Sequence, residues 1–397
     1  MKKVTIFTLL CCLSLLSVFA VTVPPGTNNL QAAINSAAAG STINLQAGTY
    51  YVSTTVTLNK QITIQGVGMS TIIQKTNGTS ADVAAFVIAE GINNCTLRDF
   101  RLLGQDKGGP GILVLSNNNH LINVEVSDCG NNSAGNETSW RSGVILDTAS
   151  FTELTSVKSH HNSWVGISQN NSPGSNITNA DCFLNHGEGL TIDLGSNNCI
   201  VRNSLFNENN VSTRGVGGIG IDHVNGADVQ GCTINGTKHL SGITFQNNDG
   251  GEDGCIIKNN TINNSAMNGV RIKNCTFPVT HTTVDLNNYS GNASTNEYWE
   301  CAPGPTSNRL AAPAQSGDLS VKVYPNPATG VISLDLGTAL SPVSFELVSL
   351  SGQRVLVLDA TKLEQQSQVD ISSVSKGVYF YHVLHSQGMV TGKLIVN

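Results

Sequence analysis

A short motif led by glycine recurs through the middle of the chain. Each copy continues with a branched apolar residue, any residue and a mostly apolar residue, and ends with a usually polar fifth residue. The copies begin at Gly111, Gly143, Gly166, Gly189, Gly218, Gly242 and Gly269. Successive glycines are 32, 23, 23, 29, 24 and 27 residues apart, which is one short repeat with insertions. A period in the twenties predicts a solenoid, in which each unit buries its apolar face against its neighbours.

The elements of this solenoid are predicted to be strands. In each repeat a second apolar strand trails the glycine-led strand by roughly ten residues, and no helical period follows. Asparagine clusters mark the joints, at 117–119, 197–198, 209–210 and 263–264. Asparagine tolerates the left-handed backbone of a sharp corner, and stacked asparagines can bond from coil to coil. Two or three strands per turn predict an all-β chain folded as a parallel β-helix.

Residues 28–39 are the exception, because they have the pattern of one short amphipathic helix. Leu30, Ala33, Ile34 and Ala37 share a face, and Gly40 follows as a stop signal. The open end of a solenoid must be covered, so we expect this helix to cap the β-helix.

The two ends of the chain predict export. Lys2 and Lys3 precede an apolar run that ends in Val18-Phe19-Ala20, which is typical of a secretory signal peptide over residues 1–20. No later segment is apolar for long enough to span a membrane. Residues 21–300 are expected to form the β-helix domain. Residues 301–320, rich in Ala, Pro, Gly and Ser, form a linker. In residues 321–397, period-two strands at short spacing predict a small antiparallel β-sandwich.

Composition excludes some functions. With 12% charged residues and a net charge of −6, the chain lacks the basic stripe of a nucleic-acid surface. Eight cysteines remain after the signal peptide, too few for a disulfide scaffold of this length. Cys182 and Cys232 are expected to face inward, and Cys275 with Cys301 is the pair that could close the end of the solenoid.

Two stretches resemble known families. The sequence from Leu30 to Tyr50, followed by Leu58-Asn-Lys-Gln-Ile-Thr-Ile-Gln-Gly66, resembles the opening of right-handed parallel β-helix proteins of the pectate-lyase-like superfamily. The resemblance covers roughly residues 27 to 290 and implies the fold. That superfamily hosts lyases, hydrolases, epimerases and non-catalytic surface proteins.

The C-terminal segment resembles the type A sorting domain of type IX secretion. The resemblance rests on Tyr324-Pro-Asn-Pro, then Ser351-Gly-Gln, then Gly377-Val-Tyr, and Lys393-Leu-Ile-Val at the terminus. It implies a Bacteroidota-type bacterium and the type IX secretion machinery as a partner of residues 321–397. The body would then be secreted, or anchored at the cell surface, after crossing the outer membrane.

Strand parity divides each repeat into inward and outward positions. The first residue after the glycine is apolar and the third is mostly apolar, so we expect both to face the core. The second and fourth are expected to face solvent. The second positions are Leu113, Ile145, Ser168, Thr191, Gly220, Thr244 and Arg271, and the fourth positions are Leu115, Asp147, Asn170, Asp193, Asp222, Gln246 and Lys273.

Asp193 and Asp222 fall on adjacent coils, so their carboxylates could approach to about 5 Å. At an effective dielectric near 20 their repulsion is about 3 kcal/mol unless water screens it. A bound cation, a shared proton, or Arg271 and Lys273 on the same face could offset it. Calcium would take oxygen ligands from Asp147, Asp193 and Asp222, with Asn170 beside them. A solvated strand face and a glycan-contacting face are the alternatives to a metal site.

Two insertions precede the glycine-led strand, at 131–141 and 209–217. They carry Trp140, Arg141 and Arg214, which suit sugar stacking and carboxylate pairing. Gly220 would leave room for a sugar ring beside Asp222. Tolerated surface loops are the alternative interpretation.

Histidines 160, 161, 186, 223 and 239 are expected at corners bordering this strand. Abstraction of the proton α to a uronate carboxylate needs a base, a group that neutralises the carboxylate, and an acid for the leaving oxygen. The candidate catalytic residues are Asp222, His223, His186 and Arg271. The candidate substrate-binding residues are Asp193, Asn170, Thr191, Lys273, Trp140, Arg141 and Arg214. Gly220-Ile-Asp-His223 resembles the Asp-Pro-His element of alginate epimerases, although it lacks the proline.

The sequence therefore predicts a secreted protein that acts on an extracellular acidic, uronate-containing polysaccharide, as a β-eliminating lyase or a C5 epimerase. A non-catalytic cell-surface module that binds glycan or mediates adhesion is the alternative.

Overall fold

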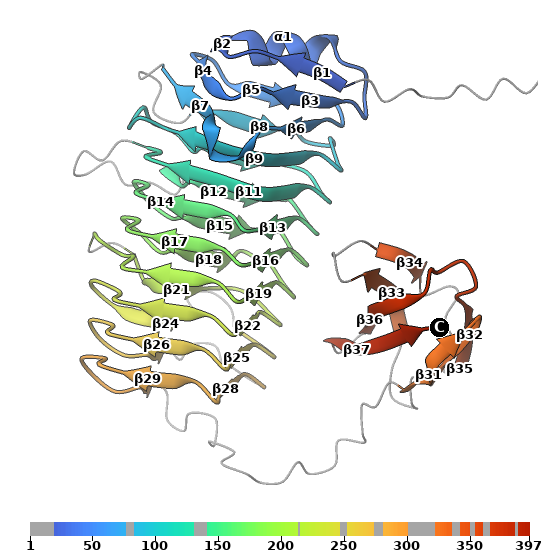
Figure 1. The fold of residues 1–397 in the computed structure, drawn as a ribbon. Helices are drawn as coiled ribbons and strands as arrows, with labels where there is room; N and C mark the ends of the chain where they lie inside the picture. Colours follow the sequence, from blue (N-terminus) through green and yellow to red (C-terminus); the bar gives the residue numbers. More distant parts are fainter. Residues whose placement is uncertain are drawn as a thin grey trace, which may run out of the picture. The chain divides into compact units, whose positions relative to one another are not determined.

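The structure is a computed structural model. It describes residues 20–76, 83–130, 141–212, 215–246, 252–273, 281–300, 322–335, 342–349, 354–359, 366–385 and 388–397. The chain divides into two compact units, Met1–Thr306 and Ser307–Asn397, with the division inside the predicted linker (Figure 1). The signal peptide up to residue 19, the linker 301–320, and Cys275 and Cys301 lie outside the described residues.

The first unit is the predicted parallel β-helix, with strands stacked coil upon coil in three columns (Figure 1). The column that contains the glycine-led strands is a ten-stranded sheet. We call it the glycine-led sheet. Its strands are β5 (Val56–Leu58), β8 (Phe86–Ile88), β10 (Ile112–Val114), β12 (Val144–Asp147), β15 (Ile167–Asn170), β18 (Leu190–Asp193), β21 (Gly217–Ile221), β24 (Ser241–Phe245), β27 (Val270–Ile272) and β30 (Glu297–Trp299).

The other two columns complete each coil, and β9 and β11 run through both of them. The second column holds β1 (Ala20–Val23), β3 (Thr42–Leu45), β6 (Thr63–Gln65), β9 (Thr96–Leu103), β11 (His120–Ser127), β13 (Glu153–Thr155), β16 (Asn176–Thr178), β19 (Ile200–Arg202), β22 (Asp228–Gln230), β25 (Ile256–Lys258) and β28 (Thr283–Asp285). The third holds β2 (Gly26–Thr27), β4 (Gly48–Val52), β7 (Thr71–Lys75), the second halves of β9 and β11, β14 (Lys158–His160), β17 (Asp181–Phe183), β20 (Leu205–Asn207), β23 (Thr233–Asn235), β26 (Thr261–Asn263) and β29 (Asn288–Ser290). A 3₁₀ turn, η1 (Gly68–Ser70), precedes β7.

The predicted parity is confirmed for the core. Every first and third residue after a repeat glycine is buried, and every fourth residue is partly exposed. The second position was predicted to face solvent, and this is wrong for Ile145, Ser168, Gly220 and Thr244, which are buried. Gly220 and Thr244 are covered because Val216, from the segment before β21, lies over them.

Close packing at the corners explains why glycine begins each repeat. A Cβ atom at Gly189 would lie 2.7 Å from Asn209 Nδ2, and one at Gly166 would lie 2.6 Å from the Gly189 carbonyl oxygen. The asparagines form a buried ladder, since Asn162 Nδ2 donates to Asn185 Oδ1 and Asn185 Nδ2 donates to Asn209 Oδ1, both at 2.9 Å. The predicted bonding of asparagines from coil to coil is therefore confirmed.

The N-terminal helix α1 (Asn29–Ser36) is confirmed as a cap, although it is shorter than the predicted 28–39. Leu30 and Ile34 are fully buried against the first coils. The helix ends at Ser36 because Ala37 takes an extended backbone with a ψ of 147°.

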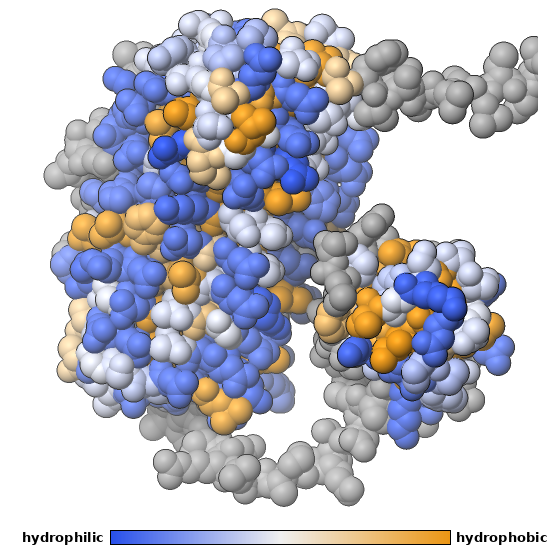
Figure 2. All heavy atoms as spheres, in the orientation of Figure 1, coloured by the Kyte–Doolittle hydropathy of each residue, from blue (hydrophilic) through white to orange (hydrophobic). Residues whose placement is uncertain are grey.

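Six cysteines of the β-helix are described, and all six are free and buried. Cys182 and Cys232 face inward as predicted, and are 0% and 1% exposed. The exterior in Figure 2 is predominantly polar, with apolar residues scattered among polar ones. In the described part of the chain, no helix has the length and apolar character that a membrane span requires.

The second unit is a small sandwich of mostly antiparallel strands, as predicted. Its strand order is β34-β33-β36-β37-β31-β32-β35. Phe345, Leu347, Val383, Ile332 and Leu334 form part of its separate core. The strands are β31 (Lys322–Thr329), β32 (Val331–Asp335), β33 (Pro342–Ser349), β34 (Arg354–Asp359), β35 (Gln366–Asp370), β36 (Gly377–His385) and β37 (Gly388–Val396).

Candidate functional site

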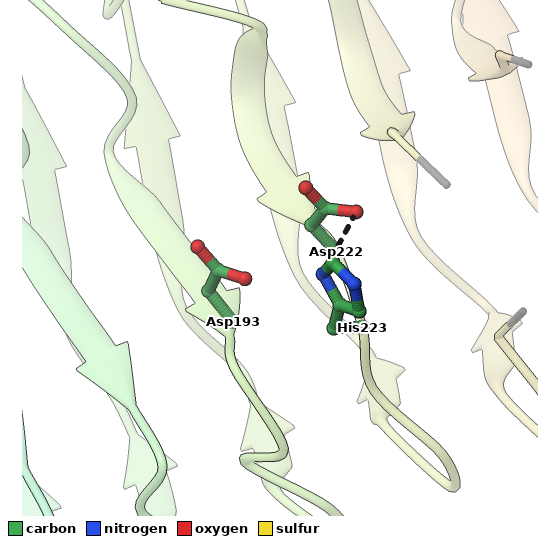
Figure 3. Close-up of side chains that lie close together, drawn as sticks. All are labelled: Asp193, Asp222 and His223. Carbon is green, nitrogen blue, oxygen red and sulfur yellow. Dashed lines mark ion pairs between the residues drawn. The ribbon is translucent and has the colours of Figure 1, made fainter. Parts of the chain in front are cut away.

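Three ionisable side chains meet where two neighbouring strands of the glycine-led sheet end. Asp193 is the last residue of β18, and Asp222 and His223 directly follow β21. Because Ile192 pairs with Ile221, Asp193 and Asp222 are neighbours on adjacent coils. One ligand atom from each of the three side chains lies within 4.8 Å of the other two (Figure 3).

The backbone of His223 brings its ring beside Asp222. His223 has a φ of 54°, a left-handed conformation that histidine adopts more readily than most residues. The ring therefore lies next to the carboxylate of the preceding residue (Figure 3). His223 Nδ1 is 3.6 Å from Asp222 Oδ1, and both side chains are mostly shielded from solvent.

The surroundings of Asp193 raise its pKa. Burial raises the pKa of Asp193 above its ordinary value, and the negative charge of Asp222 raises it further. The Leu194 N–H, which donates to Asp193 Oδ1 at 2.6 Å, and the nearby His223 act in the opposite direction. A proton held by one of the two aspartates was an expected compensation and agrees with this raised pKa, and the adjacent His223 is a further compensating group that was not expected.

Glu188 is an acidic residue near this cluster that the sequence analysis did not single out. It is only 2% exposed, and its Oε1 accepts a hydrogen bond from the Val216 N–H. Its Oε2 has no hydrogen-bond partner among the described residues. Burial raises the pKa of Glu188 to about 7, and Asp193 contributes to the rise. A sequence signal was present, since Glu188 is the one charged residue that directly precedes a repeat glycine.

Trp164 is a second residue that the sequence analysis missed. Its indole packs over Gly187 of the next coil, because a Cβ atom at Gly187 would lie 3.3 Å from Trp164 Cδ2. The side chain is partly exposed, so it offers an aromatic edge at the corner that leads into the glycine-led sheet. The sequence did carry a signal for Trp164. It lies two residues before Gly166, the same repeat position that Arg141 occupies before Gly143 in the preceding repeat.

Two of the predicted substrate-binding residues lie beside the cluster. Asn170 pairs with Asp193 across β15 and β18, and Thr191 lies two residues before Asp193 on the same outer face. Thr191 Oγ1 donates to Ser168 Oγ at 3.1 Å, and Ser168 Oγ lies 3.3 Å from Asn170 Oδ1. These polar groups extend the outer surface of the cluster toward the N-terminal coils.

The predicted basic residues lie farther along the sheet. Arg271 pairs with Thr244, which pairs with Gly220, so Arg271 is two coils from Gly220, roughly 10 Å. Its guanidinium is bound to Glu300 Oε1 at 2.5 Å and lies 5.9 Å from the centre of the Tyr298 ring. Lys273 is likewise two coils from Asp222. The structure therefore does not bring Arg271 or Lys273 to the carboxylates.

His186 lies at the corner before β18, at the opposite end of this strand from Asp193. Its charge acts on Asp106. His160 belongs to β14 in the third column, where its ring stacks on Phe183 at 4.5 Å. His160 is the last residue of β14 and so lies next to the corner that leads to β15 of the glycine-led sheet.

The two insertions are described only in part. Trp140 and Arg214 lie outside the described residues. Arg141 is 6% exposed, and its Nε and Nη1 have no hydrogen-bond partner in the described part of the chain. The room expected beside Gly220 is filled, since Val216 Cγ2 lies 2.8 Å from the position of a Gly220 Cβ.

Asp193 and Asp222 could share a hard cation, with His223 as the third potential ligand. Two carboxylates offer at most four oxygens, whereas calcium takes about 6–8, so water or a bound ligand would complete the shell. Asp147 is separated from Asp193 by the intervening Asn170, roughly 10 Å along the stack, and cannot join them on one ion. The protein donors fit a partly hydrated cation.

Residues 322–397 match the family model of the secretion system C-terminal sorting domain. The chain carries a C-terminal sorting domain. This domain implies secretion or attachment at the outer surface through the type IX machinery.

The body of the protein has the pectate-lyase-like parallel β-helix fold. It is similar to the enzymatically active domain of tailspike protein 2 of bacteriophage CBA120, with a TM-score of 0.55, 12% identity, and coverage of 95% of this chain and 76% of that one. It is also similar to endo-xylogalacturonan hydrolase of Aspergillus tubingensis, with a TM-score of 0.51, 12% identity, and coverage of 72% and 97%. The A-module of the Azotobacter vinelandii mannuronan C-5 epimerase AlgE4 matches with a TM-score of 0.46, 17% identity, and coverage of 70% and 93%. A sequence comparison with curated proteins finds no match.

Proposed function

We propose that the protein acts on an extracellular, uronate-containing polysaccharide, and that the reaction takes place at Asp193, Asp222 and His223. The observation that carries the proposal is the convergence of these three side chains within 4.8 Å on the outer face of the glycine-led sheet. The sorting domain supports an extracellular substrate. The same fold carries an endo-xylogalacturonan hydrolase, so a glycan is a substrate that this architecture can accommodate.

The chemistry that this arrangement favours is abstraction of the proton on C5 of a uronate. His223 acts as the base, and Asp222 beside it orients the ring and stabilises the imidazolium that forms. Burial raises the pKa of Asp193, and in its protonated form Asp193 would donate a hydrogen bond to the substrate carboxylate. That bond strengthens as negative charge develops on the carboxylate in the transition state.

Two products follow from the same proton abstraction. Return of a proton to the opposite face of C5 gives the epimer. Cleavage of the bond between C4 and its glycosidic oxygen, with formation of a double bond between C4 and C5, gives an unsaturated sugar, and the leaving oxygen takes the proton that His223 removed from C5. The common step is the one assigned to His223.

A cation is an alternative way to neutralise the substrate carboxylate. Asp193 and Asp222 would hold it, and its charge would take over the role assigned here to the proton on Asp193. Dialysis against a chelator tests this alternative. An unchanged melting temperature and unchanged glycan binding after chelation would rule the cation out.

The proposal is tested by incubating the purified protein with alginate, pectate and ulvan. Ultraviolet absorbance of unsaturated products, release of reducing ends and, by nuclear magnetic resonance, the ratio of the C5 epimers are followed in parallel. An unsaturated product supports the lyase, whereas new reducing ends without it support a hydrolase. Binding with no chemical change on any polymer supports the non-catalytic alternative and contradicts the proposal.

A further inference from the structure

Val216 is fastened on both sides where it crosses the outer face of the glycine-led sheet. Its N–H donates to Glu188 Oε1, from the corner before β18. Its carbonyl oxygen accepts a hydrogen bond from Thr244 Oγ1, on β24, at 2.6 Å. Between these attachments its side chain packs on Gly220 of β21. We call Glu188, Val216 and Thr244 the Val216 clamp.

The clamp covers the second-position row between Thr191 and Arg271, both of which are partly exposed. Thr191, Gly220 and Thr244 are consecutive neighbours in that row. Thr191 is partly exposed, whereas Gly220 is buried and Thr244 is 1% exposed. Since Gly220 lies two residues before Asp222, Val216 forms a wall immediately beside the reacting cluster.

The attachment of Val216 to Glu188 is sensitive to the protonation state of the Glu188 carboxyl group. Its carboxyl group is almost fully buried, and Oε2 has no partner among the described residues. A buried carboxyl group in such surroundings is stable when neutral and costly when ionised. Asp193 is the charged group whose field acts on it, and that field also opposes ionisation. The Val216 N–H and the backbone N–H of Glu188 itself favour the ionised carboxylate, but burial has the larger effect, so the pKa of Glu188 is raised.

We propose that Glu188 positions Val216 as a movable wall of the glycan site, closed while Glu188 holds its proton and open once Glu188 ionises. The closed form binds the proton more tightly than an open form in which Glu188 reaches water, so rising pH favours opening. The existence of this movement does not depend on the proposed function, but its consequence for glycan binding rests on it.

Opening would change which sugars the site accepts. With Val216 displaced, Gly220 would present a gap without a side chain beside Asp222, which is wide enough for a sugar ring to approach the backbone. The accessible row would then continue from Thr191 to Thr244. We therefore expect long glycan chains to gain affinity with rising pH more than short ones do.

The test is hydrogen–deuterium exchange of the Val216 amide in the full-length protein. In the wild type we expect its protection factor to fall by about tenfold or more between about pH 5.5 and about pH 8.5, because the pKa of Glu188 is raised from its ordinary value to about 7. Glu188→Gln keeps an acceptor for Val216 but cannot ionise, so its protection should not change with pH. Thr244→Val, which removes the other attachment, should lower protection at both pH values.

Equal protection of Val216 at both pH values in the wild type would overturn the proposal. So would the same pH-dependent fall in Glu188→Gln. Exchange of the Ile192 and Ile221 amides in the same samples reports whether each variant keeps the fold. Because this readout needs no glycan, the expected exchange pattern without activity on any polymer would leave the clamp standing and contradict only the proposed function.

Discussion

At the scale of single residues, the proposed chemistry depends on the charge of Asp222. Replacing it with asparagine keeps the size of the side chain but removes the anion beside His223. We expect Asp222→Asn to lower the turnover rate on a uronate polymer by about 10²- to 10⁴-fold, as for other removals of acid–base assistance. The melting temperature should stay close to that of the wild type, because Asp222 lies on the outer face. A variant with full activity would contradict the site assignment.

Gln169 allows a stability test at the same scale. Gln169 is the third residue after Gly166, so its side chain faces inward, between Leu146 and Ile192 of the neighbouring coils. It is fully buried, and its Nε2 and Oε1 have no hydrogen-bond partner among the described residues. Gln169→Leu is expected to raise the free energy of unfolding by about 1–3 kcal/mol, because an unpaired buried amide is removed.

Thermal unfolding measures this change. The matched control is Gln65→Leu, the same substitution at a partly exposed position, which should shift stability by less than about 0.5 kcal/mol. A clear loss of stability in Gln169→Leu would show that the amide is hydrogen-bonded in solution.

At the scale of elements, the buried asparagine ladder holds the corners that begin the glycine-led strands. Asn185 donates to Asn209 Oδ1 and to the Ser159 carbonyl, and accepts from Asn162. Asn185→Ala is expected to destabilise the β-helix by about 3 kcal/mol or more, since it leaves buried groups of its neighbours unpaired. Asn288→Ala, at an exposed position of the last coil, is the control and should have little effect. Equal melting temperatures for both variants would show that the ladder does not stabilise the corners.

Elements are also the scale at which sequence prediction succeeds and fails. Parity from each repeat glycine predicted the inward Ile and Val side chains, because strand geometry alone decides which way a side chain points. It failed at Gly220, because Val216 covers this residue from an insertion whose path the repeat does not encode. Arg271 was expected near the carboxylates, yet Glu300 on the next coil binds it. The pairing of Arg271 with Glu300 depends on side-chain rotamers and on the sequence of the last coil, and the repeat pattern predicts neither.

The same limit applies within the candidate site. The neighbouring places of Asp193 and Asp222 followed from the repeat alone, since the fourth residue of each copy falls in one row. The burial of Glu188 did not, because it depends on Val216, which lies within the 209–217 insertion, whose path the repeat does not encode.

At the scale of the whole molecule, the β-helix and the sorting domain have separate hydrophobic cores. A chain that ends before residue 321 should therefore keep the melting transition of the β-helix but fail to appear outside the cell. Cell fractionation with an antibody against the β-helix measures export, and calorimetry measures stability. Normal export of the shortened chain would contradict the role of the sorting domain.

The central claim is that this exported β-helix removes the proton on C5 of a uronate at Asp193, Asp222 and His223. The most direct test is incubation of the uronate polymers with the full-length protein in deuterium oxide, followed by nuclear magnetic resonance of the sugars. Both the lyase and the epimerase break the bond between C5 and its hydrogen, so the wild type is predicted to give deuterium at C5 or an unsaturated product, and Asp222→Asn far less of either. Retention of every C5 hydrogen in intact chains treated with the wild type would contradict the account.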